Sequence, residues 1–147
     1  MTSQAVAVGG VALRSVVMTA SGTAGHGDEL AGYGELSDLG AVVTKSLAVF
    51  AFEGNPSPRL AASGEHMVNA VGLSGPGVAA WREQHLPALR RRGATVVGSI
   101  WGRTVEEFAA AAEAMRGAEI VALEVNASCP NLESRREIFA HSAQATA

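Results

Sequence analysis

The chain has 147 residues, a formal net charge of −3 at pH 7, 48% hydrophobic residues and 17% charged residues. This composition is typical of a globular protein with a buried core, and the acidic balance gives no electrostatic basis for binding nucleic acid. No run approaches the roughly 20 apolar residues of a membrane span, and a single cysteine cannot form an internal disulfide, so we expect a cytoplasmic protein that docks on no membrane.

Four short apolar runs, rich in β-branched residues, predict β-strands. None of them alternates cleanly between apolar and polar residues, so each is interpreted as a strand buried on both faces, as in a parallel sheet. The four runs are Ser15–Thr19, Ala41–Lys45, Thr95–Ile100 and Ile120–Asn126.

Helical segments are predicted between these strands. Residues 28–39 indicate a weak helix, loosened by Gly32 and Gly34, and residues 78–92 indicate a helix that is kinked or broken near Pro87. The alternation of strands and helices predicts parallel βαβ units.

The best-marked helix follows the third strand. Residues 104–107 (TVEE) form the pattern of a capping box, and the Ala-rich helix that they open is expected to run to about Arg116, where Gly117 supplies a stop. The fourth strand comes next, followed by a tail that is expected to start another helix.

Residues 46–77 are different from the rest of the chain. With three prolines and five glycines, this segment cannot be one regular element. A connection this long inside a compact domain is either functional or a sign of misassignment. Because it directly follows Lys45, a functional loop is favoured.

Each predicted strand ends in a cluster of polar residues. In parallel α/β architectures the site lies at the carboxyl ends of the strands, so this placement predicts a functional edge, although it does not distinguish a barrel from an open sheet. The clusters are Thr19–Thr23, Lys45–Ser46, Ser99–Gly102 and Asn126–Asn131.

Two singular residues belong to these clusters. Lys45 is the only lysine among eleven basic residues, and it provides a compact point charge that arginine cannot supply. Cys129 is the only cysteine; such a residue is either a small buried hydrophobe or, in a loop at the functional edge, a reactive group. The four histidines lack the spacing of zinc ligands, so no metal site is predicted.

Six segments occur in the order and spacing of one enzyme family: MTASGT (18–23), GAVVTKSL (40–47), GNPSPRL (54–60), NAVGL (69–73), GSIWGRTVEEF (98–108) and EVNASCPNLE (124–133). On these segments the chain resembles the class 1 dihydroorotate dehydrogenases. The resemblance implies an FMN-binding α/β barrel of the TIM type, (β/α)8, that oxidises dihydroorotate to orotate in pyrimidine biosynthesis. Members of this family are about twice as long. We therefore expect residues 1–147 to be the N-terminal portion of a single barrel domain, about four βα units with a short N-terminal extension.

The resemblance also assigns roles residue by residue. Cys129 matches the catalytic base, and Lys45 is expected to take part in catalysis as well as in binding. Flavin contacts are implied for Ser21, Lys45, Ser46, Ser99 and Asn126. Substrate contacts are implied for Lys45, Asn69, Ala70, Val71, Gly72, Leu73, Asn126 and Asn131.

These residue types suit the reaction. Oxidation of a saturated C–C bond beside a carbonyl requires a base for the acidic proton, and a thiolate can serve near neutral pH. A fixed ammonium stabilises negative charge that develops on the flavin, and asparagine amides match the donors and acceptors of a pyrimidine ring.

The resemblance leaves several points open. The expected partners are dihydroorotate and orotate, further copies of the chain in a homo-oligomer when the enzyme is complete, and an electron-transfer subunit; the electron acceptor itself is not identified. The 147-residue chain alone is expected to be inactive. The alternatives are a non-catalytic truncated half-barrel and an FMN barrel that acts on another pyrimidine.

Overall fold

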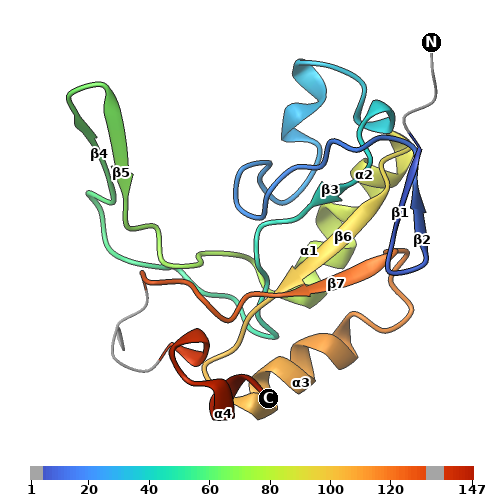
Figure 1. Cartoon of the computed structure of the whole chain (residues 1–147). Helices are drawn as coiled ribbons and strands as arrows, with labels where there is room; N and C mark the ends of the chain where they lie inside the picture. Colours follow the sequence, from blue (N-terminus) through green and yellow to red (C-terminus); the bar gives the residue numbers. More distant parts are fainter. Residues whose placement is uncertain (1–4, 132–137) are drawn as a thin grey trace.

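A parallel three-stranded sheet lies at the centre of the protein (Figure 1). The computed structural model describes residues 5–131 and 138–147. Strands β3 (Val42–Val43), β6 (Val96–Ile100) and β7 (Ala122–Val125) lie in the order β3-β6-β7, and both pairings are parallel. The last three predicted strands are therefore confirmed in position and direction.

The first predicted strand lies beside β3, but as an irregular segment. It makes one parallel bridge, between Met18 and Ala41, and the Thr19 amide donates to the Ala41 carbonyl at 3.2 Å. The four predicted strands thus follow one another across the sheet in chain order. This arrangement is the one expected of consecutive βα units in a barrel.

The prediction of strands buried on both faces is right for two of the four. Both residues of β3 and all five of β6 are buried. The prediction is wrong for the outer two, where Val17 is 56% and Val125 is 60% exposed. These two segments lie at the two edges of the described sheet, so each has a neighbouring strand on one side only.

Helices α1 (Val78–Gln84), α2 (Leu86–Arg91) and α3 (Val105–Ala114) pack on one face of the sheet (Figure 1). Burial of their apolar side chains against the sheet supplies most of the favourable free energy of this packing. The largest core cluster includes Val42, Val96 and Ile100 of the sheet, Trp81, Leu86 and Leu89 of α1 and α2, and Ala111 and Met115 of α3 and its C-terminal end.

The helix ends follow the sequence closely, with one difference. The helix predicted over residues 78–92 is broken at His85, and Pro87 lies in the first turn of α2, where its missing N–H costs nothing. Thr104 Oγ1 accepts a hydrogen bond from the Glu107 amide, as a capping box requires. The Glu107 carboxylate, however, accepts from the Arg103 amide at 2.7 Å, so the box is not reciprocal.

The helix predicted over residues 28–39 is wrong. The structure has two short 3-10 turns there, η1 (Glu29–Gly32) and η2 (Leu36–Asp38). The Glu29 carboxylate accepts hydrogen bonds from the His26 and Gly27 amides, which fixes a turn at the start of the segment. Glycine is a poor helix former, so Gly32 and Gly34 weaken the remainder.

The N-terminal extension is an antiparallel hairpin of β1 (Val6–Val8) and β2 (Val11–Leu13). Its buried Leu13 packs with Ala41, Val43 and Val97 in a second apolar cluster. In Figure 1 the hairpin lies near the start of β6 and β7, away from the carboxyl ends of the strands. The extension therefore leaves the carboxyl edge of the sheet open.

The long segment 46–77 contains a second hairpin that was not predicted. Strands β4 (Leu60–Ser63) and β5 (His66–Asn69) pair in antiparallel fashion, and all eight of their residues are exposed. Gly64, with φ of 62°, supplies the left-handed conformation of the tight turn. Figure 1 shows this hairpin projecting from the body as an arm, on the side of the carboxyl ends of the strands.

The tail ends in two short helical turns, η3 (Phe139–His141) and α4 (Ala143–Thr146). The Phe139 ring packs edge-on against Phe108 of α3, with ring centroids 5.4 Å apart. The end of the EVNASCPNLE segment, residues 132 and 133, lies outside the described residues. Among the helices that the structure describes, none is both long enough and apolar enough to cross a membrane.

Candidate active site

Polar side chains from three neighbouring strands meet at the carboxyl edge of the sheet. Ser46 follows β3, Ser99 lies near the end of β6, and Asn126 directly follows β7. The Ser46 and Ser99 hydroxyl oxygens are 2.8 Å apart, and Asn126 Nδ2 donates to Ser46 Oγ at 2.8 Å. Three of the predicted flavin contacts therefore lie within one hydrogen-bonded group.

This group is held firmly by the sheet. Ser46 is 2% and Ser99 is 0% exposed. The Ser99 amide donates to Thr44 Oγ1 at 3.0 Å, and Ser99 Oγ donates to Glu124 Oε1 of β7 at 2.8 Å. Buried hydroxyls with all their partners in place have one orientation, so the edge is preorganised.

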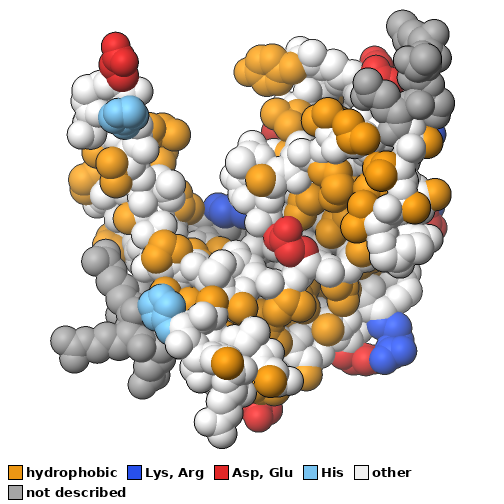
Figure 2. Space-filling model, viewed as in Figure 1, with side chains coloured by type: hydrophobic (Ala, Val, Ile, Leu, Met, Phe, Trp, Pro, Cys, Tyr) orange, Lys and Arg blue, Asp and Glu red, His pale blue; other side chains and the backbone are white. Residues whose placement is uncertain are grey.

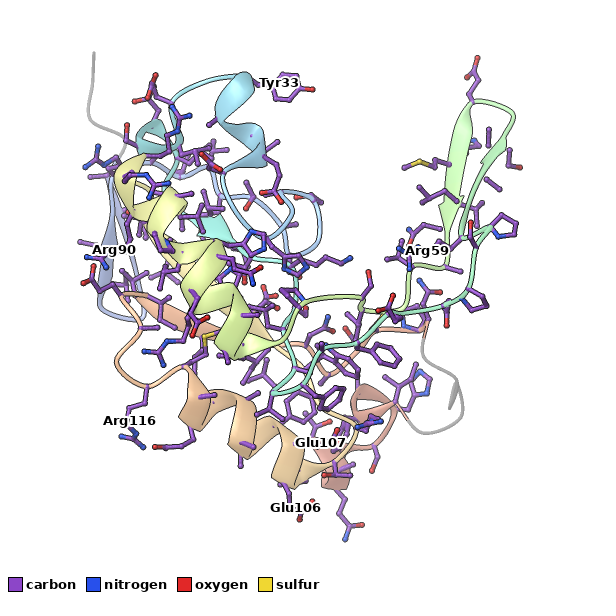
Figure 3. The ribbon with its side chains drawn as sticks, turned by 180° about the vertical axis from the view of Figure 1, so that it is seen from behind. Tyr33, Arg59, Arg90, Glu106, Glu107 and Arg116 are labelled. Carbon is purple, nitrogen blue, oxygen red and sulfur yellow. The ribbon has the colours of Figure 1, made fainter. Side chains whose placement is uncertain are left out.

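Lys45 lies at the same edge and points to the long loop. Its ammonium donates to Ser74 Oγ at 2.9 Å, and its backbone amide donates to the Gly25 carbonyl at 2.9 Å. Burial, and to a smaller extent the Arg59 guanidinium, lower the pKa of Lys45 below its ordinary value. Figure 3 places Arg59 at the base of the β4–β5 arm. Lys45 is thus a half-buried cation between the sheet and the arm.

His26 is close enough to Lys45 for the two groups to interact electrostatically. Its ring is 5.8 Å from the ring of His85, and its Nδ1 atom is buried without a hydrogen-bond partner among the described residues. Burial, followed by the charges of Lys45 and His85, lowers the pKa of His26. The positively charged imidazole is therefore less favoured here than in a free histidine.

The segment Asn69–Leu73 and the loop after β7 are in contact. Asn131 Nδ2 lies 3.4 Å from the Asn69 carbonyl oxygen. Asn55 ties the two together, because its Nδ2 donates to the carbonyls of Ala70 at 2.8 Å and Asn131 at 2.9 Å. The predicted substrate segment therefore lies against the loop that carries the cysteine, directly at Asn69 and through Asn55 at Ala70.

Two residues of this segment have left-handed backbone conformations. Gly72 has φ of 71°, and Leu73 has φ of 57°. A Cβ on Gly72 would lie 2.8 Å from Asn55 Nδ2 and 2.9 Å from the Asn131 oxygen. The close approach of the two loops therefore requires glycine here.

Cys129 is a free, half-buried cysteine in the loop that follows β7. It packs against a buried cluster of Ala48, Leu73 and Trp101. Leu73 thereby links the predicted base to the predicted substrate segment. The rings of Phe50 and Phe52 pack against Trp101 and enlarge this apolar cluster.

Ser21 is the predicted site residue that is least tied to the others. It lies in the turn after the first strand, where the Thr23 amide donates to the Ala20 carbonyl at 3.1 Å. Within the described part of the chain, no hydrogen bond joins Ser21 to another predicted site residue. Its turn nevertheless follows the segment that lies beside β3, at the carboxyl end.

Sequence reasoning missed three residues that hold this edge together, Glu124, Ser74 and Asn55, and also the buried His26 near Lys45. Glu124 had a signal, because it stands two residues before Asn126 in a strand, and residues two apart share a face. The other three come from loops, and their partners are set by tertiary contacts alone. Among the described residues, no three His, Cys, Asp or Glu side chains cluster as metal ligands.

The surface of the protein has a wide gap beside the β4–β5 arm and hollows elsewhere. Figure 2 shows a wide gap between the β4–β5 arm and the body of the protein. Two other hollows lie away from this edge: one is lined by residues of α2 and Glu119, the other by the end of α3 and the start of β7. Neither contains the residues of the carboxyl edge.

Comparisons with known proteins point to one enzyme family. The family model described as dihydroorotate dehydrogenase matches residues 3–146. The catalytic subunit of dihydroorotate dehydrogenase B (NAD(+)) from Geotalea uraniireducens is 42% identical over 135 residues, which are 91% of this chain and 44% of that protein. The protein of the same name from Desulforudis audaxviator is 46% identical over 131 residues, 88% of this chain and 43% of its own length.

A solved structure supports the fold. The dihydroorotate dehydrogenase of Eimeria tenella, in complex with ferulenol, superposes with a TM-score of 0.72 at 18% identity, and the match covers 91% of this chain and 39% of that one. The chain spans less than half the length of the curated relatives that it matches. The prediction of a partial α/β barrel is confirmed, and the chain belongs to the dihydroorotate dehydrogenase family.

Proposed function

We propose that this chain is the N-terminal part of an FMN-dependent enzyme that oxidises dihydroorotate to orotate, and that residues 1–147 form part of one barrel domain. The observation that carries the proposal is the meeting of Lys45, Ser46, Ser99 and Asn126 at one edge of the sheet, beside the loop of Cys129. These residues come from segments far apart in the sequence.

The donor set at this edge fits a flavin. Hydroxyl, amide and ammonium groups from adjacent strands offer both donors and acceptors to the polar pyrimidine edge of an isoalloxazine ring. Ser46, Asn126 and Lys45 would hold that ring, with Ser21 at its side, and the fully buried Ser99 would support Ser46 through the bond between their hydroxyl groups. Bound FMN supplies the acceptor for the hydride that leaves the substrate.

The chain's own residues have defined tasks in this reaction. Cys129, as a thiolate, takes the proton from the carbon beside the substrate carbonyl, while the hydride leaves the neighbouring carbon, so that a C=C bond forms. The segment Asn69–Leu73, with Asn126 and Asn131, binds and orients the pyrimidine ring. Lys45 stabilises the negative charge that develops during the reaction.

The names of the relatives favour one electron acceptor. They are called catalytic subunits of an NAD(+)-dependent enzyme, so we propose that electrons pass from this chain's flavin to NAD(+) through a partner subunit. The names also favour dihydroorotate over another pyrimidine. A complete enzyme of this kind is proposed to be a homo-oligomer of such catalytic chains.

The test uses a barrel of the relatives' full length whose first 147 residues are this chain, referred to below as the completed barrel. It is expected to bind FMN and to show bleaching of the flavin absorbance when dihydroorotate is added without oxygen. Dihydrouracil, which lacks the carboxylate, serves as the matched substrate control. A completed barrel that folds but binds no flavin would favour the non-catalytic alternative, and reduction by dihydrouracil alone would favour another pyrimidine.

A further inference from the structure

Glu124 ends a chain of hydrogen bonds that crosses three strands. Ser99 Oγ donates to Glu124 Oε1 at 2.8 Å, the Ser46 and Ser99 hydroxyl oxygens lie 2.8 Å apart, and Asn126 Nδ2 donates to Ser46 Oγ at 2.8 Å. Ser99 and Glu124 are direct neighbours in the register of β6 and β7. The chain of bonds therefore begins and ends on residues two positions apart, Glu124 and Asn126.

The carboxylate fixes the direction of every bond in the chain. An ionised carboxylate only accepts hydrogen bonds, and a serine hydroxyl has one hydrogen to donate. Because Ser99 donates its only hydroxyl hydrogen to Glu124, Ser46 must be the donor in the hydrogen bond between the two serines. The Ser46 oxygen is then left as the acceptor for Asn126.

The direction of the bonds sets the orientation of the Asn126 amide. Its Nδ2 faces Ser46, and its Oδ1 lies on the other side, where it accepts from the Ser128 amide at 3.3 Å. An amide turned by 180° would place two acceptors or two donors against each other. Glu124, together with the Ser128 amide, thus determines which atoms Asn126 can present to a ligand.

The environment makes this control effective. Ser46 and Ser99 are both buried, so a reversed or broken chain would leave buried hydroxyl groups without partners, which is costly in free energy. None of the ion pairs among the described residues includes Glu124. Its carboxylate is committed to the hydroxyl chain.

We propose that Glu124 is a positioning residue of the ligand site, which holds the Asn126 amide in the one orientation that complements the pyrimidine ring and the flavin. The inference rests on the proposed function, because it takes Ser46 and Asn126 to be the groups that meet these ligands. Glu124 itself acts through Ser99 and Ser46.

Two substitutions at Glu124 test the effect of its charge and the effect of its side-chain length separately. Glu124→Asp keeps the charge but shortens the side chain by one methylene, which withdraws the acceptor from Ser99. Glu124→Gln keeps the length but removes the charge, and its amide can also donate to Ser99, which permits the reverse direction. Glu119→Gln is the matched control, because Glu119 lies before β7 in a surface ion pair with Arg90.

The measurements are made on the completed barrel: the dissociation constant of orotate, followed by the flavin spectrum, and the midpoint potential of the bound flavin. Glu124→Asp is expected to weaken orotate binding about tenfold with little change in potential. Glu124→Gln is expected to weaken binding about threefold and to make the potential more positive, because a negative charge near the flavin is removed. Glu119→Gln should match the parent in both.

The outcomes separate this inference from the proposed function. If the parent binds no FMN, or is not reduced by dihydroorotate, the proposed function is wrong. If the parent is active and both Glu124 variants share its orotate affinity and potential, the positioning role of Glu124 is wrong. If one of the two variants fails to retain flavin, the orotate affinity of the other variant tests the positioning role: an affinity equal to that of the parent contradicts it, and a weaker affinity supports it.

Discussion

Lys45 and Ser74 join the sheet to the long loop. The Lys45 ammonium donates to Ser74 Oγ at 2.9 Å. Ser74 directly follows the segment Asn69–Leu73. This one bond therefore connects Lys45, which is proposed to contact the flavin, to the segment that is proposed to bind the substrate. Burial lowers the pKa of Lys45, which means that the ammonium lies in surroundings where its charge acts strongly.

Lys45→Ala in the completed barrel should slow the reduction of the flavin and weaken orotate binding. Loss of a cation where negative charge develops should raise the barrier by about 2–4 kcal/mol. Lys45→Arg should also be slow, because the planar guanidinium is wider than an ammonium. Ser74→Ala is the comparison, because it keeps the charge of Lys45 and removes only one hydrogen bond. It should raise the barrier to flavin reduction by about 1 kcal/mol. Single-turnover reduction by dihydroorotate measures all three, and a parent-like rate in Lys45→Ala would make Lys45 a structural cation.

Gly72→Ala should disturb the contact between the two loops. The new Cβ would clash with Asn55 and with the Asn131 carbonyl, in a backbone conformation that alanine adopts only with strain. We expect a loss of about 1–3 kcal/mol in the free energy of unfolding, together with weaker orotate binding.

Gly64→Ala is the matched control for this substitution. Gly64 also has a left-handed backbone, with φ of 62°, but beyond its two chain neighbours no described residue has an atom within 4 Å of the position of its Cβ. It should lose stability through strain alone and bind orotate like the parent. Denaturant unfolding and orotate titration separate the two effects, and equal orotate affinity in both variants would contradict the role of the loop contact.

The sequence was most informative where a local pattern decides the structure. The apolar runs of β3, β6 and β7, the break before Pro87 and the cap at Thr104 depend on neighbouring residues, and each of these was predicted. The placement of polar residues at strand ends also correctly indicated the edge where Ser46, Ser99 and Asn126 meet.

The predictions failed where distant residues decide. The tight turn at Gly64 lies in a segment dense in proline and glycine, so the hairpin was not recognised. The exposure of Val17 and Val125 depends on what lies beside them in the sheet, which a periodicity cannot reveal. Ser74 and Asn55 acquire their roles only through partners elsewhere in the fold.

His26 should make the stability of the completed barrel depend on pH. Burial lowers its pKa in the folded state, so the unfolded chain binds the proton more readily than the folded protein does. Stability from this group is therefore complete above the unfolded pKa of about 6.5 and falls as the pH decreases below it. The titratable groups near His26 are Lys45, His85 and Glu29.

Thermal unfolding between pH 5 and pH 8 measures this effect. His26→Gln keeps a polar side chain that does not titrate, so its melting temperature should fall less on acidification than that of the parent. His141→Gln, at an exposed position, is the matched control and should follow the parent. Identical pH profiles for His26→Gln and the parent would show that His26 is readily protonated in the folded state.

The 147-residue chain alone should not retain FMN or oxidise dihydroorotate. The irregular segment beside β3 and the outer strand β7 carry exposed apolar residues such as Val17 and Val125, and an open strand edge invites association. Size-exclusion chromatography of the isolated chain is expected to show oligomers or aggregates without flavin absorbance. A yellow, monomeric and active preparation would be incompatible with this expectation.

Cys129→Ser should slow flavin reduction in the completed barrel. The substitution keeps the size and hydrogen bonding of the side chain, but a serine hydroxyl is a far weaker acid than a thiol and supplies almost no ionised base near neutral pH. If Cys129 takes the substrate proton, the variant should therefore reduce its flavin much more slowly than the parent near neutral pH.

Cys129→Ala removes the base altogether. The reaction should then be about 10²–10⁴-fold slower than in the parent, which corresponds to about 3–5 kcal/mol of barrier. Orotate binding should persist, because the amide groups that hold the ring remain and the loop still packs through Leu73 and Trp101. Stopped-flow reduction by dihydroorotate across pH, in the parent and in both variants, measures these rates. If Cys129→Ala reduces its flavin as fast as the parent at all pH values, the cysteine is a packing residue of the Trp101 cluster and another group is the base.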